Sequence, residues 1–448
     1  MARIATLLTA ALAATATEAF PTPENIAKLA RSTGTGTGTD GLGSISDLHA
    51  ELLRLRDEQA VLTKKRSSSP SPIDVSGDHA FVPPSEGDQR GPCPGLNALA
   101  NHNYVSHDGA ISVVEQIKAA TEVFNFGVDL ATVLGLIGVL FVGNPLSANP
   151  SYSIGGATPE VENLLDNLGG LLGTPEGLEH SHNIIESDAS STRDDLYQTG
   201  DAGTLNLDFF TELYESIEGD ALTREEVAEH AIRRFNHSIA NNPYFWNGPV
   251  TNVMMRPVGY VLVNDMLANH TDNNPDETTS KAVLRSFYSI TEDPSNGSLS
   301  YTRGHERIPE NWFPRQTPYT ILDFNAAEAA LLLKKPELLS VGGNTGTVNS
   351  FTGIDLGNLT GGVFNAASLL EGNNLVCFAL EVVKFAGPNA LSSALKTLSE
   401  PVELLGRIAA PLVDLSCPVF EDLTLGGTSF WDHALQTYPG ANKSGSAL

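Results

Sequence analysis

A cysteine between two prolines, at the head of a short helix-forming run, constrains the local fold of this chain more than any other feature. The stretch is Pro92-Cys93-Pro94, followed by residues 95–102. Proline suits the first position of a helix, where an N–H has no partner to lose, so Cys93 is predicted to be the N-cap. The free N–H groups of Gly95 and Leu96 then point back toward its sulfur, and with the helix dipole they lower the pKa of the thiol and favour a thiolate. Such a thiolate is a nucleophile or a soft metal ligand; the alternative is a buried structural thiol or half of a disulfide.

Composition limits the class of protein. The chain has 448 residues, enough for one large domain with appendages or for two domains. Its formal net charge of −27 argues against a nucleic-acid partner and favours a soluble, self-repelling surface. The three cysteines are Cys93, Cys377 and Cys417, and no C-x-x-C pair occurs, which excludes zinc-finger and thioredoxin-like sites.

The N-terminus has the pattern of a secretory signal peptide. Arg3 precedes an apolar run at residues 4–14, and small residues follow at 16–19. Residues 1–19 are therefore predicted to be removed, and the protein to be secreted into an oxidising environment. Five Asn-x-Ser/Thr sequons fit a secreted glycoprotein, although each pattern also arises by chance: Asn236, Asn269, Asn296, Asn358 and Asn442.

Residues 20–66 are predicted to form a pro-segment or linker. A Gly/Thr tract at 33–43 is typical of a flexible linker, and a capping-box pattern precedes an amphipathic run at 48–62. The run ends in Lys64-Lys65-Arg66. This basic triplet is a processing site or, alternatively, the ordinary basic end of a helix.

Helical periodicity dominates the rest of the chain, so the fold is predicted to be mostly α. The run 123–142 is apolar enough to suggest a membrane span, but Asn125 and Asp129 interrupt it, which favours a buried core helix or helix pair. Strand-like alternation is scarce. Further helices are expected at residues 208–216, 223–238, 253–268 and 389–405. We expect a single large helical domain at residues 67–330 and a C-terminal extension at 331–448 that packs on it.

A second informative stretch covers residues 182–193. If it is helical, Glu186, Ser190 and Arg193 lie at i, i+4 and i+7 and share one face. A carboxylate and a hydroxyl one turn apart are hard oxygen ligands that suit magnesium or manganese. The alternative is a helix start without a metal, in which Asp188 is the cap and Arg193 pairs with Glu186.

Together these stretches resemble the haem-thiolate peroxidase family, which contains the fungal chloroperoxidases and unspecific peroxygenases. Three blocks carry the resemblance, in this order: Pro92-Cys93-Pro94 with Leu96-Asn97-Ala98-Leu99-Ala100-Asn101-His102, then His182-Asn183 with Glu186-x-Asp188-Ala189-Ser190-x-Thr192-Arg193, and last Glu306-Arg307-Ile308-Pro309-Glu310-Asn311-Trp312. The resemblance covers residues 74–320. It implies a mostly helical haem-thiolate peroxidase domain, in agreement with the periodicity.

The resemblance also implies roles for individual residues. Cys93 is expected to hold the iron of haem b as its axial ligand, and the N–H groups of Gly95 and Leu96 to tune its electron donation. In this family the segment that starts at the position of Glu186 binds magnesium or manganese beside a haem propionate. The ligands implied here are the Glu186 carboxylate, the Ser187 carbonyl and the Ser190 hydroxyl.

The two other cysteines lie in the C-terminal extension. With Cys93 on iron, Cys377 and Cys417 remain for a disulfide, and some long peroxygenases carry a similar C-terminal bridge. A closed loop of roughly 40 residues stabilises the folded state by about 4 kcal/mol in the chain-entropy model.

Two positions depart from the family pattern. Ser187 stands where chloroperoxidases have histidine and long peroxygenases have glycine, so a histidine-assisted relay is not expected. Where the family has its distal glutamate this chain has Tyr260, with Arg256 one helical turn earlier. A phenol with a pKa of about 10 is a poor base, while an arginine in the pocket stabilises charge on the departing oxygen. The alternative is that Tyr260 packs in the core and Asp265 is the base.

The predicted function is peroxygenation of small aromatic or aliphatic molecules with hydrogen peroxide. The enzymatic alternatives are a peroxidase of secondary-metabolite biosynthesis and a haloperoxidase. The non-enzymatic alternative is a secreted haem-binding protein with a degraded distal site. No membrane span is expected in the mature chain, and the sequence makes no prediction of the oligomeric state.

Overall fold

The computed structural model describes residues 45–443, with gaps at 145–148, 162–174, 250–254, 272–273, 275–276, 373, 376, 379–422 and 426–427. The prediction of a mostly helical fold is confirmed. Four predicted features lie outside the described residues: the signal peptide at 1–19, the flexible linker at 33–43, the helix at 389–405, and Cys417.

The buried core helix or helix pair predicted at 123–142 is present as the end of a π-helical turn followed by one core helix. A π-helical turn, η2 (Ala120–Phe124), follows α5 (Val113–Ala119), and α6 (Val128–Val142) begins after a break. The break is at Asn125, whose φ of 56° is left-handed and ends the first helix. Among the described residues, no helix is both long and apolar enough to span a bilayer. Buried side chains of α6, among them Leu130, Ile137 and Val142, belong to the hydrophobic core.

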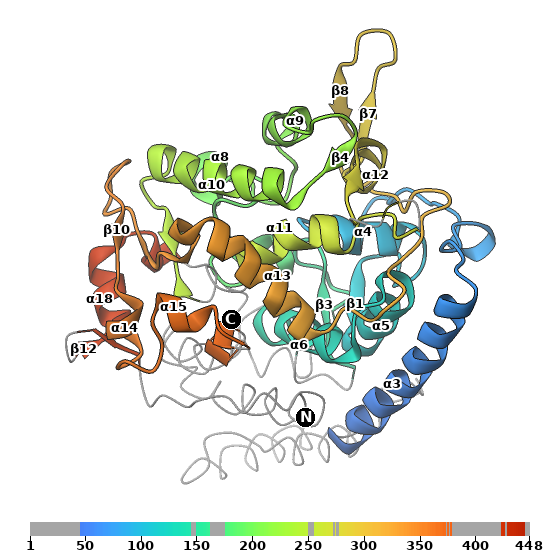
Figure 1. Cartoon of the computed structure of the whole chain (residues 1–448), viewed down its shortest axis with the longest axis horizontal. Coiled ribbons are helices and arrows are strands. Elements are labelled where there is room, and N and C mark those ends of the chain that lie inside the picture. Colours follow the sequence, from blue (N-terminus) through green and yellow to red (C-terminus); the bar gives the residue numbers. More distant parts are fainter. Residues whose placement is uncertain are drawn as a thin grey trace, which may run out of the picture.

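The second half of the described chain adds the helices that surround this core. They are α9 (Leu207–Glu215), α10 (Arg224–Asn241), α11 (Arg256–Asp265), α12 (Lys281–Phe287) and α13 (Ile321–Lys334). Thr223 and Glu226 form the capping box that starts α10, and α11 packs between α10 and α13. Figure 1 shows α10 above α13, with α11 between them and α4 and α5 to the right. The helices predicted at 208–216 and 223–238 are confirmed, and most of the one at 253–268 is present as α11.

The strands are short, as the scarcity of alternation predicts. An antiparallel sheet has the order β1-β3-β2, and a hairpin of β7 and β8 projects at the top of Figure 1. The strand bounds are β1 (Ala110–Ser112), β2 (Gly143–Asn144), β3 (Ser151–Ser153), β4 (Ala221–Leu222), β5 (Trp246–Asn247), β6 (Thr279–Ser280), β7 (Ile290–Glu292), β8 (Leu299–Tyr301), β9 (Gly342–Gly343), β10 (Thr352–Gly353), β11 (Thr424–Leu425) and β12 (Thr428–Ser429). The remaining helices are α3 (Ile45–Ser68), η1 (Gly77–His79), α4 (Pro94–Asn101), η3 (Leu178–His180), α8 (Leu196–Thr199), η5 (Pro336–Leu339), α14 (Leu356–Leu359), α15 (Ala366–Leu369), α18 (Phe430–Thr437) and η7 (Ala441–Lys443).

The predicted amphipathic helix before the basic triplet is present as α3. Leu52 and Leu55 on one face are buried, and the helix packs on α6 and η2. The Gln59 amide bridges the break before α6: it donates to the Phe126 carbonyl and accepts from the Val128 N–H, which has no partner within its own helix. Lys64-Lys65-Arg66 lies near the end of α3, with Lys65 and Arg66 in its last turn, so the alternative of a basic helix end describes its geometry. Removal of this segment stays a prediction.

Because α3 covers the core, Leu52→Ala is expected to lower the free energy of unfolding by about 2–5 kcal/mol. Leu52 is 0% exposed, whereas Val61 on the same helix is 70% exposed. Val61→Ala is therefore the matched control, expected to change stability by less than about 0.5 kcal/mol. Denaturant unfolding of both variants measures the difference, and equal midpoints would show that α3 is not part of the cooperative fold.

The described part of the C-terminal extension packs on the helical core through a small sheet. Strand β9 pairs with β10 on one side and with β5 on the other, so Trp246 lies opposite Gly343. A Cβ at Gly343 would approach the Phe245 carbonyl oxygen to 2.6 Å, which explains the glycine there. The boundary predicted at residue 330 falls inside α13, because that helix continues to Lys334.

Candidate functional site

Cys93 is the N-cap of α4, as the two prolines predict. Its φ and ψ are −88° and 108°, Pro94 occupies the first helical position, and the Asn97 N–H donates to the Cys93 carbonyl over 3.1 Å. The Asn97 side chain also exchanges two hydrogen bonds with the Gly91 backbone, at 2.9 and 3.0 Å. Gly91 itself is confined, since a Cβ there would lie 2.0 Å from the Ile154 carbonyl oxygen. The loop that carries the cysteine is thus held on both sides.

The protonation of the Cys93 thiol differs from the prediction. Burial raises the pKa of this free thiol, and the Leu96 and Gly95 N–H groups and Arg193 lower it by less. Neither N–H closes a hydrogen bond of normal geometry to the sulfur. The prediction of a lowered pKa is therefore wrong for the protein alone, because desolvation outweighs the helix end. A thiol that coordinates a metal ion loses its proton outright.

The loop at residues 181–195 contains the second predicted stretch, and it is not helical. Asn183 and Ala189 have φ values of 61° and 58°, which no right-handed helix accommodates. The prediction that Glu186, Ser190 and Arg193 share a helix face is therefore wrong. The alternative of a helix start capped by Asp188 also fails, because Arg193 donates to the Pro92 carbonyl over 3.2 Å and the next helix, α8, has Asp195 as its N-cap. The Arg193 contact joins this loop to the cysteine loop.

Glu186 is buried at the centre of the 181–195 loop. One carboxylate oxygen, Oε2, lies 2.7 Å from Nδ1 of His182, and the other, Oε1, has no hydrogen-bond partner. Burial disfavours the charged imidazole, but the Asp188 and Glu186 carboxylates raise the pKa of His182 to about 9. The neighbouring carboxyl groups therefore favour the protonated form of His182 beside Glu186. Glu186, the predicted cation ligand, therefore keeps one carboxylate oxygen without a hydrogen-bond partner within the described residues.

The other predicted cation ligands lie in the same loop. Ser187 is buried, and the half-buried Ser190 donates its hydroxyl to the Arg193 carbonyl over 3.5 Å. Within the described ranges, His, Cys, Asp and Glu side chains form no group of three that is arranged to hold a metal ion. The magnesium or manganese site therefore stays a prediction.

The predicted distal residues have partners elsewhere in the fold. The Tyr260 hydroxyl donates to the Ala189 carbonyl over 2.6 Å, and burial raises the pKa of this phenol further. Arg256 donates to Asn247 Oδ1 and to the Leu338 carbonyl, at 2.5 and 2.6 Å, and burial lowers its pKa to about 10. These contacts bring Tyr260 to the 181–195 loop and Arg256 to the C-terminal region.

The alternative base, Asp265, is engaged as well. Its carboxylate accepts hydrogen bonds from Arg224 at 2.6 Å and from the Tyr319 hydroxyl at 2.7 Å. Both oxygens of the Asp265 carboxylate are therefore occupied by partners within the fold. Asp265 therefore joins α11 to α10 and to the chain before α13.

Sequence reasoning gave no separate role to Glu306, a buried carboxylic acid near the cysteine. It is 1% exposed, neither carboxylate oxygen makes a hydrogen bond of normal geometry, and burial raises its pKa although Arg193 lowers it. The charge of Glu306 also raises the pKa of the Cys93 thiol. The Glu306 backbone carbonyl accepts a hydrogen bond from Asn101 of α4 at 2.9 Å. Its place in the third sequence block was the signal that pointed to it.

Comparison with known proteins identifies the class to which this fold and site belong. Residues 79–317 match the family model described as "Peroxidase, family 2". The chain is 45% identical to the aromatic peroxidase fscJ of Fusarium equiseti over 413 residues, or 90% of this chain and 94% of that one. It is 39% identical to the dothistromin biosynthesis peroxidase dotB of Dothistroma septosporum, over 83% of this chain and 86% of that one. An aromatic peroxygenase of Coprinellus radians is 31% identical over 51% of this chain and 92% of its own.

The protein is thus a peroxidase, an oxidoreductase that acts on hydrogen peroxide. It belongs to peroxidase family 2, whose members use haem bound to a thiolate.

The residues present fit such a cofactor. Buried polar atoms without a hydrogen-bond partner gather in the two joined loops and the elements packed on them: His182 Nε2, Glu186 Oε1, Asp188 Oδ1, Ser191 Oγ, Arg193 Nε, Arg234 Nη1 and both carboxylate oxygens of Glu306. Native folds leave few such atoms, so a concentration of them is where a bound group would find hydrogen-bond partners. An apolar ring also lies close to the cysteine, since a Cβ at Gly95 would meet Phe124 at 3.6 Å. Apolar surface beside charged groups suits a macrocycle that carries carboxylates.

Proposed function

We propose that this chain is a secreted haem-thiolate peroxidase that oxidises a small aromatic molecule of secondary metabolism. The observation that carries the proposal is Cys93, a free thiol at the start of α4 whose loop is bonded to a second loop rich in unpartnered polar atoms. The two relatives that match most of the chain are named for an aromatic substrate class and for the biosynthesis of a metabolite. Peroxygenation is the second candidate, supported by the peroxygenase of Coprinellus radians.

The chain's own residues account for binding and positioning in this proposal. Cys93 holds the iron, while the Gly95 and Leu96 N–H groups and Arg193 favour its thiolate form. A haem on a thiolate supplies the cleavage of the peroxide O–O bond. Tyr260 holds the Ala189 carbonyl and so keeps the left-handed turn at that residue in place. Arg193 holds the two loops together through the Pro92 carbonyl.

Product analysis with purified holoenzyme, hydrogen peroxide and a phenolic substrate tests the function. Oxidative coupling products support the peroxidase. A hydroxylated product that carries ¹⁸O from labelled peroxide supports the peroxygenase instead. Haem binding without turnover would establish the non-enzymatic alternative, a haem-binding protein without a working distal site.

Substitution of Glu186 tests whether the protein binds a divalent cation. We propose that the free Oε1 of Glu186, with the Ser187 carbonyl and the Ser190 hydroxyl, binds magnesium or manganese beside the cofactor. Glu186→Gln is expected to lower metal content to below about a tenth and to weaken haem retention, since an amide is a poorer ligand for a hard cation. Elemental analysis and haem content of both proteins measure this. Wild-type protein without stoichiometric metal would remove the cation from the proposal.

Secretion and glycosylation are further parts of the proposal, and Asn296 offers a test. Residues 293–298 at the tip of the β7–β8 hairpin are exposed, and the Ser298 N–H donates to Asn296 Oδ1 over 2.9 Å. In the Asn236 sequon, by contrast, the Ser238 hydroxyl is buried and bonded to Asp195. The secreted protein is therefore expected to carry a glycan at Asn296. Asn296→Gln should remove an endoglycosidase-sensitive mass that the control Asn236→Gln retains.

The disulfide between Cys377 and Cys417 also remains a proposal. Cys377 is fully buried and Cys93 is the free cysteine of the described residues, whereas Cys417 lies outside them. Peptide mapping of the non-reduced protein tests the pair, and alkylation of both thiols would contradict it.

A further inference from the structure

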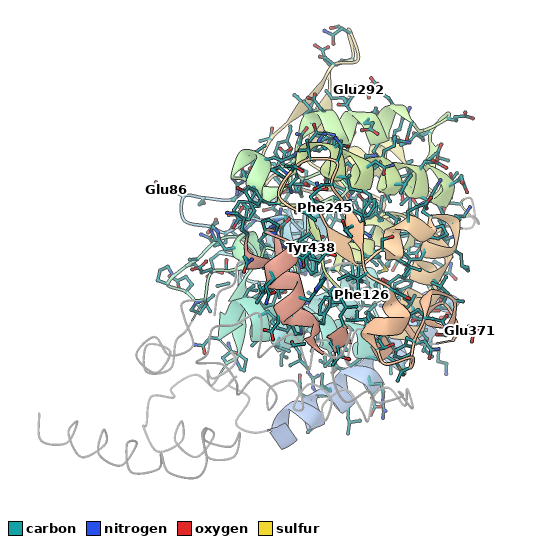
Figure 2. The ribbon with its side chains drawn as sticks, turned by 90° about the vertical axis from the view of Figure 1, so that its left-hand side faces the viewer. Glu86, Phe126, Phe245, Glu292, Glu371 and Tyr438 are labelled. Carbon is teal, nitrogen blue, oxygen red and sulfur yellow. The ribbon has the colours of Figure 1, made fainter. Side chains whose placement is uncertain are left out.

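The end of the described chain packs against the candidate site. We call residues 430–443, which comprise α18 and η7, the C-terminal clasp; they lie outside the part of the chain that matches the family model. Tyr438 anchors the clasp: it is 1% exposed, its ring lies 4.9 Å from that of Trp246, and its hydroxyl donates to the Thr352 carbonyl over 3.0 Å. Figure 2 shows Tyr438 beside Phe245 in the middle of the molecule.

The turn after Tyr438 brings the clasp backbone into direct contact with the site. A Cβ at Gly440 would lie only 1.8 Å from the Tyr244 carbonyl oxygen, so no larger residue fits without a shift of backbone. The Asn183 side-chain amide donates to the Gly440 carbonyl over 3.5 Å. Asn183 belongs to the 181–195 loop and has a left-handed φ of 61°. The clasp therefore contacts the loop at one of its two strained residues.

Lys443 adds a second contact, at the last described residue. Its Nζ lies 4.4 Å from the centre of the Tyr197 ring and 4.6 Å from that of Tyr244, within the range of cation–π attraction. The Tyr197 hydroxyl donates to the Lys443 carbonyl over 3.2 Å. Side chain and backbone of Lys443 thus both hold Tyr197 of α8.

Tyr197 links the clasp to the proposed cofactor site. Its ring meets the His182 ring edge to face, with centroids 5.2 Å apart. His182 is buried, and its Nδ1 lies 2.7 Å from Glu186 Oε2. Three contacts therefore lead from Lys443 to the carboxylate that has a free oxygen.

We propose that the C-terminal clasp holds the 181–195 loop closed on the cofactor, with Lys443, Tyr197 and His182 as positioning residues for Glu186. None of the three is assigned contact with peroxide or substrate; they act by fixing where the Glu186 carboxylate stands. The inference deepens the proposed function, on which it rests. It also gives a physical reason why the C-terminal region folds back on the helical core.

Two variants of the full-length protein test the clasp. Gly440→Ala introduces the clash with the Tyr244 carbonyl oxygen, and Lys443→Met removes the cation but keeps an unbranched side chain. Gly353→Ala is the matched control, because a Cβ at Gly353 in the same region meets no atom closer than 3.8 Å. In protein without haem, amide hydrogen exchange at residues 182–197 is measured. In haem-loaded protein, the rate of haem transfer to apomyoglobin is measured.

Gly440→Ala is expected to speed both hydrogen exchange at 182–197 and haem loss at least about tenfold, which a change of 1.4 kcal/mol produces. Lys443→Met is expected to speed hydrogen exchange at 182–197 and haem loss about two- to fivefold each, because it removes one partly exposed cation–π pair. Gly353→Ala should match the wild type.

Faster exchange without faster haem loss, or no change in either rate, would overturn the proposal. If Gly440→Ala does not fold, Lys443→Met decides by the same two rates. If the wild type binds no haem, the proposed function fails, and exchange at 182–197 still decides whether the clasp holds the loop.

Discussion

Cys93→Ala is expected to remove thiolate ligation and, with it, at least about 99% of the peroxide-dependent activity. The thiolate is the group that drives cleavage of the peroxide O–O bond, and alanine offers the iron no ligand. The reduced carbon-monoxide complex should lose the strongly red-shifted Soret band typical of thiolate ligation. Absorption spectra and haem content of wild type and variant measure the change.

Gly95→Ala is the control for this substitution. Its added methyl group would meet the Phe124 ring at 3.6 Å, an ordinary contact, and the residue keeps its backbone N–H. The thiolate band should therefore remain. An unchanged haem content and Soret band in Cys93→Ala, or a histidine-type band in the wild type, would mean that another residue holds the iron.

Arg256→Gln is expected to lower the free energy of unfolding by about 3 kcal/mol. The guanidinium is buried and donates charged hydrogen bonds to Asn247 and to the Leu338 carbonyl; each such bond contributes about 1.5–3 kcal/mol. The guanidinium also lies over the Phe235 ring, within the range of cation–π attraction. It interacts with the buried Glu328 carboxyl: burial raises the pKa of Glu328, and the charge of Arg256 lowers that pKa by less. Denaturant unfolding measures the loss.

The same variant separates a structural from a catalytic role for Arg256. If this residue only supports the fold, the rate constant for the reaction of folded variant with peroxide should fall less than about tenfold. Loss of a group that stabilises charge in the transition state costs about 10²–10³. Arg233→Gln is the control, because Arg233 is exposed and its ion pair with Glu212 contributes at most about 1 kcal/mol. A normal stability with a 100-fold slower reaction would restore Arg256 to the distal site.

The cysteine site was predictable because its chemistry is local. Pro94 has a φ that already suits a helix, and Cys93 directly precedes it, so the cap geometry depends on neighbours in the chain. The pKa of the thiol was not predictable in this way, because burial is set by the whole fold and outweighs the adjacent N–H groups.

The 181–195 loop was misjudged because its spacing allows a helix that its environment overrides. The left-handed turn at Ala189 is stabilised by two partners: Tyr260, outside the loop, donates to the Ala189 carbonyl, and Asp195, at the end of the loop, accepts from the Ala189 N–H. Arg193 donates a hydrogen bond to the Pro92 carbonyl rather than pairing with Glu186. A pattern of i, i+4 and i+7 shows which residues a helix would align, but it contains no information about such partners.

The sequence by itself determined that this chain is a mostly helical peroxidase with a cysteine at a helix start, because cap chemistry, helical periodicity and the three sequence blocks are properties of neighbouring residues. Only the tertiary structure decided which polar groups remain free. It engaged Tyr260, Arg256 and Asp265 in contacts within the fold and left Glu186 with an unpartnered oxygen. The physical reason is that buried polar groups are stabilised by partners that the fold supplies, and each of the three engaged side chains has a partner more than 50 residues away in the chain: Ala189 for Tyr260, Leu338 for Arg256 and Tyr319 for Asp265.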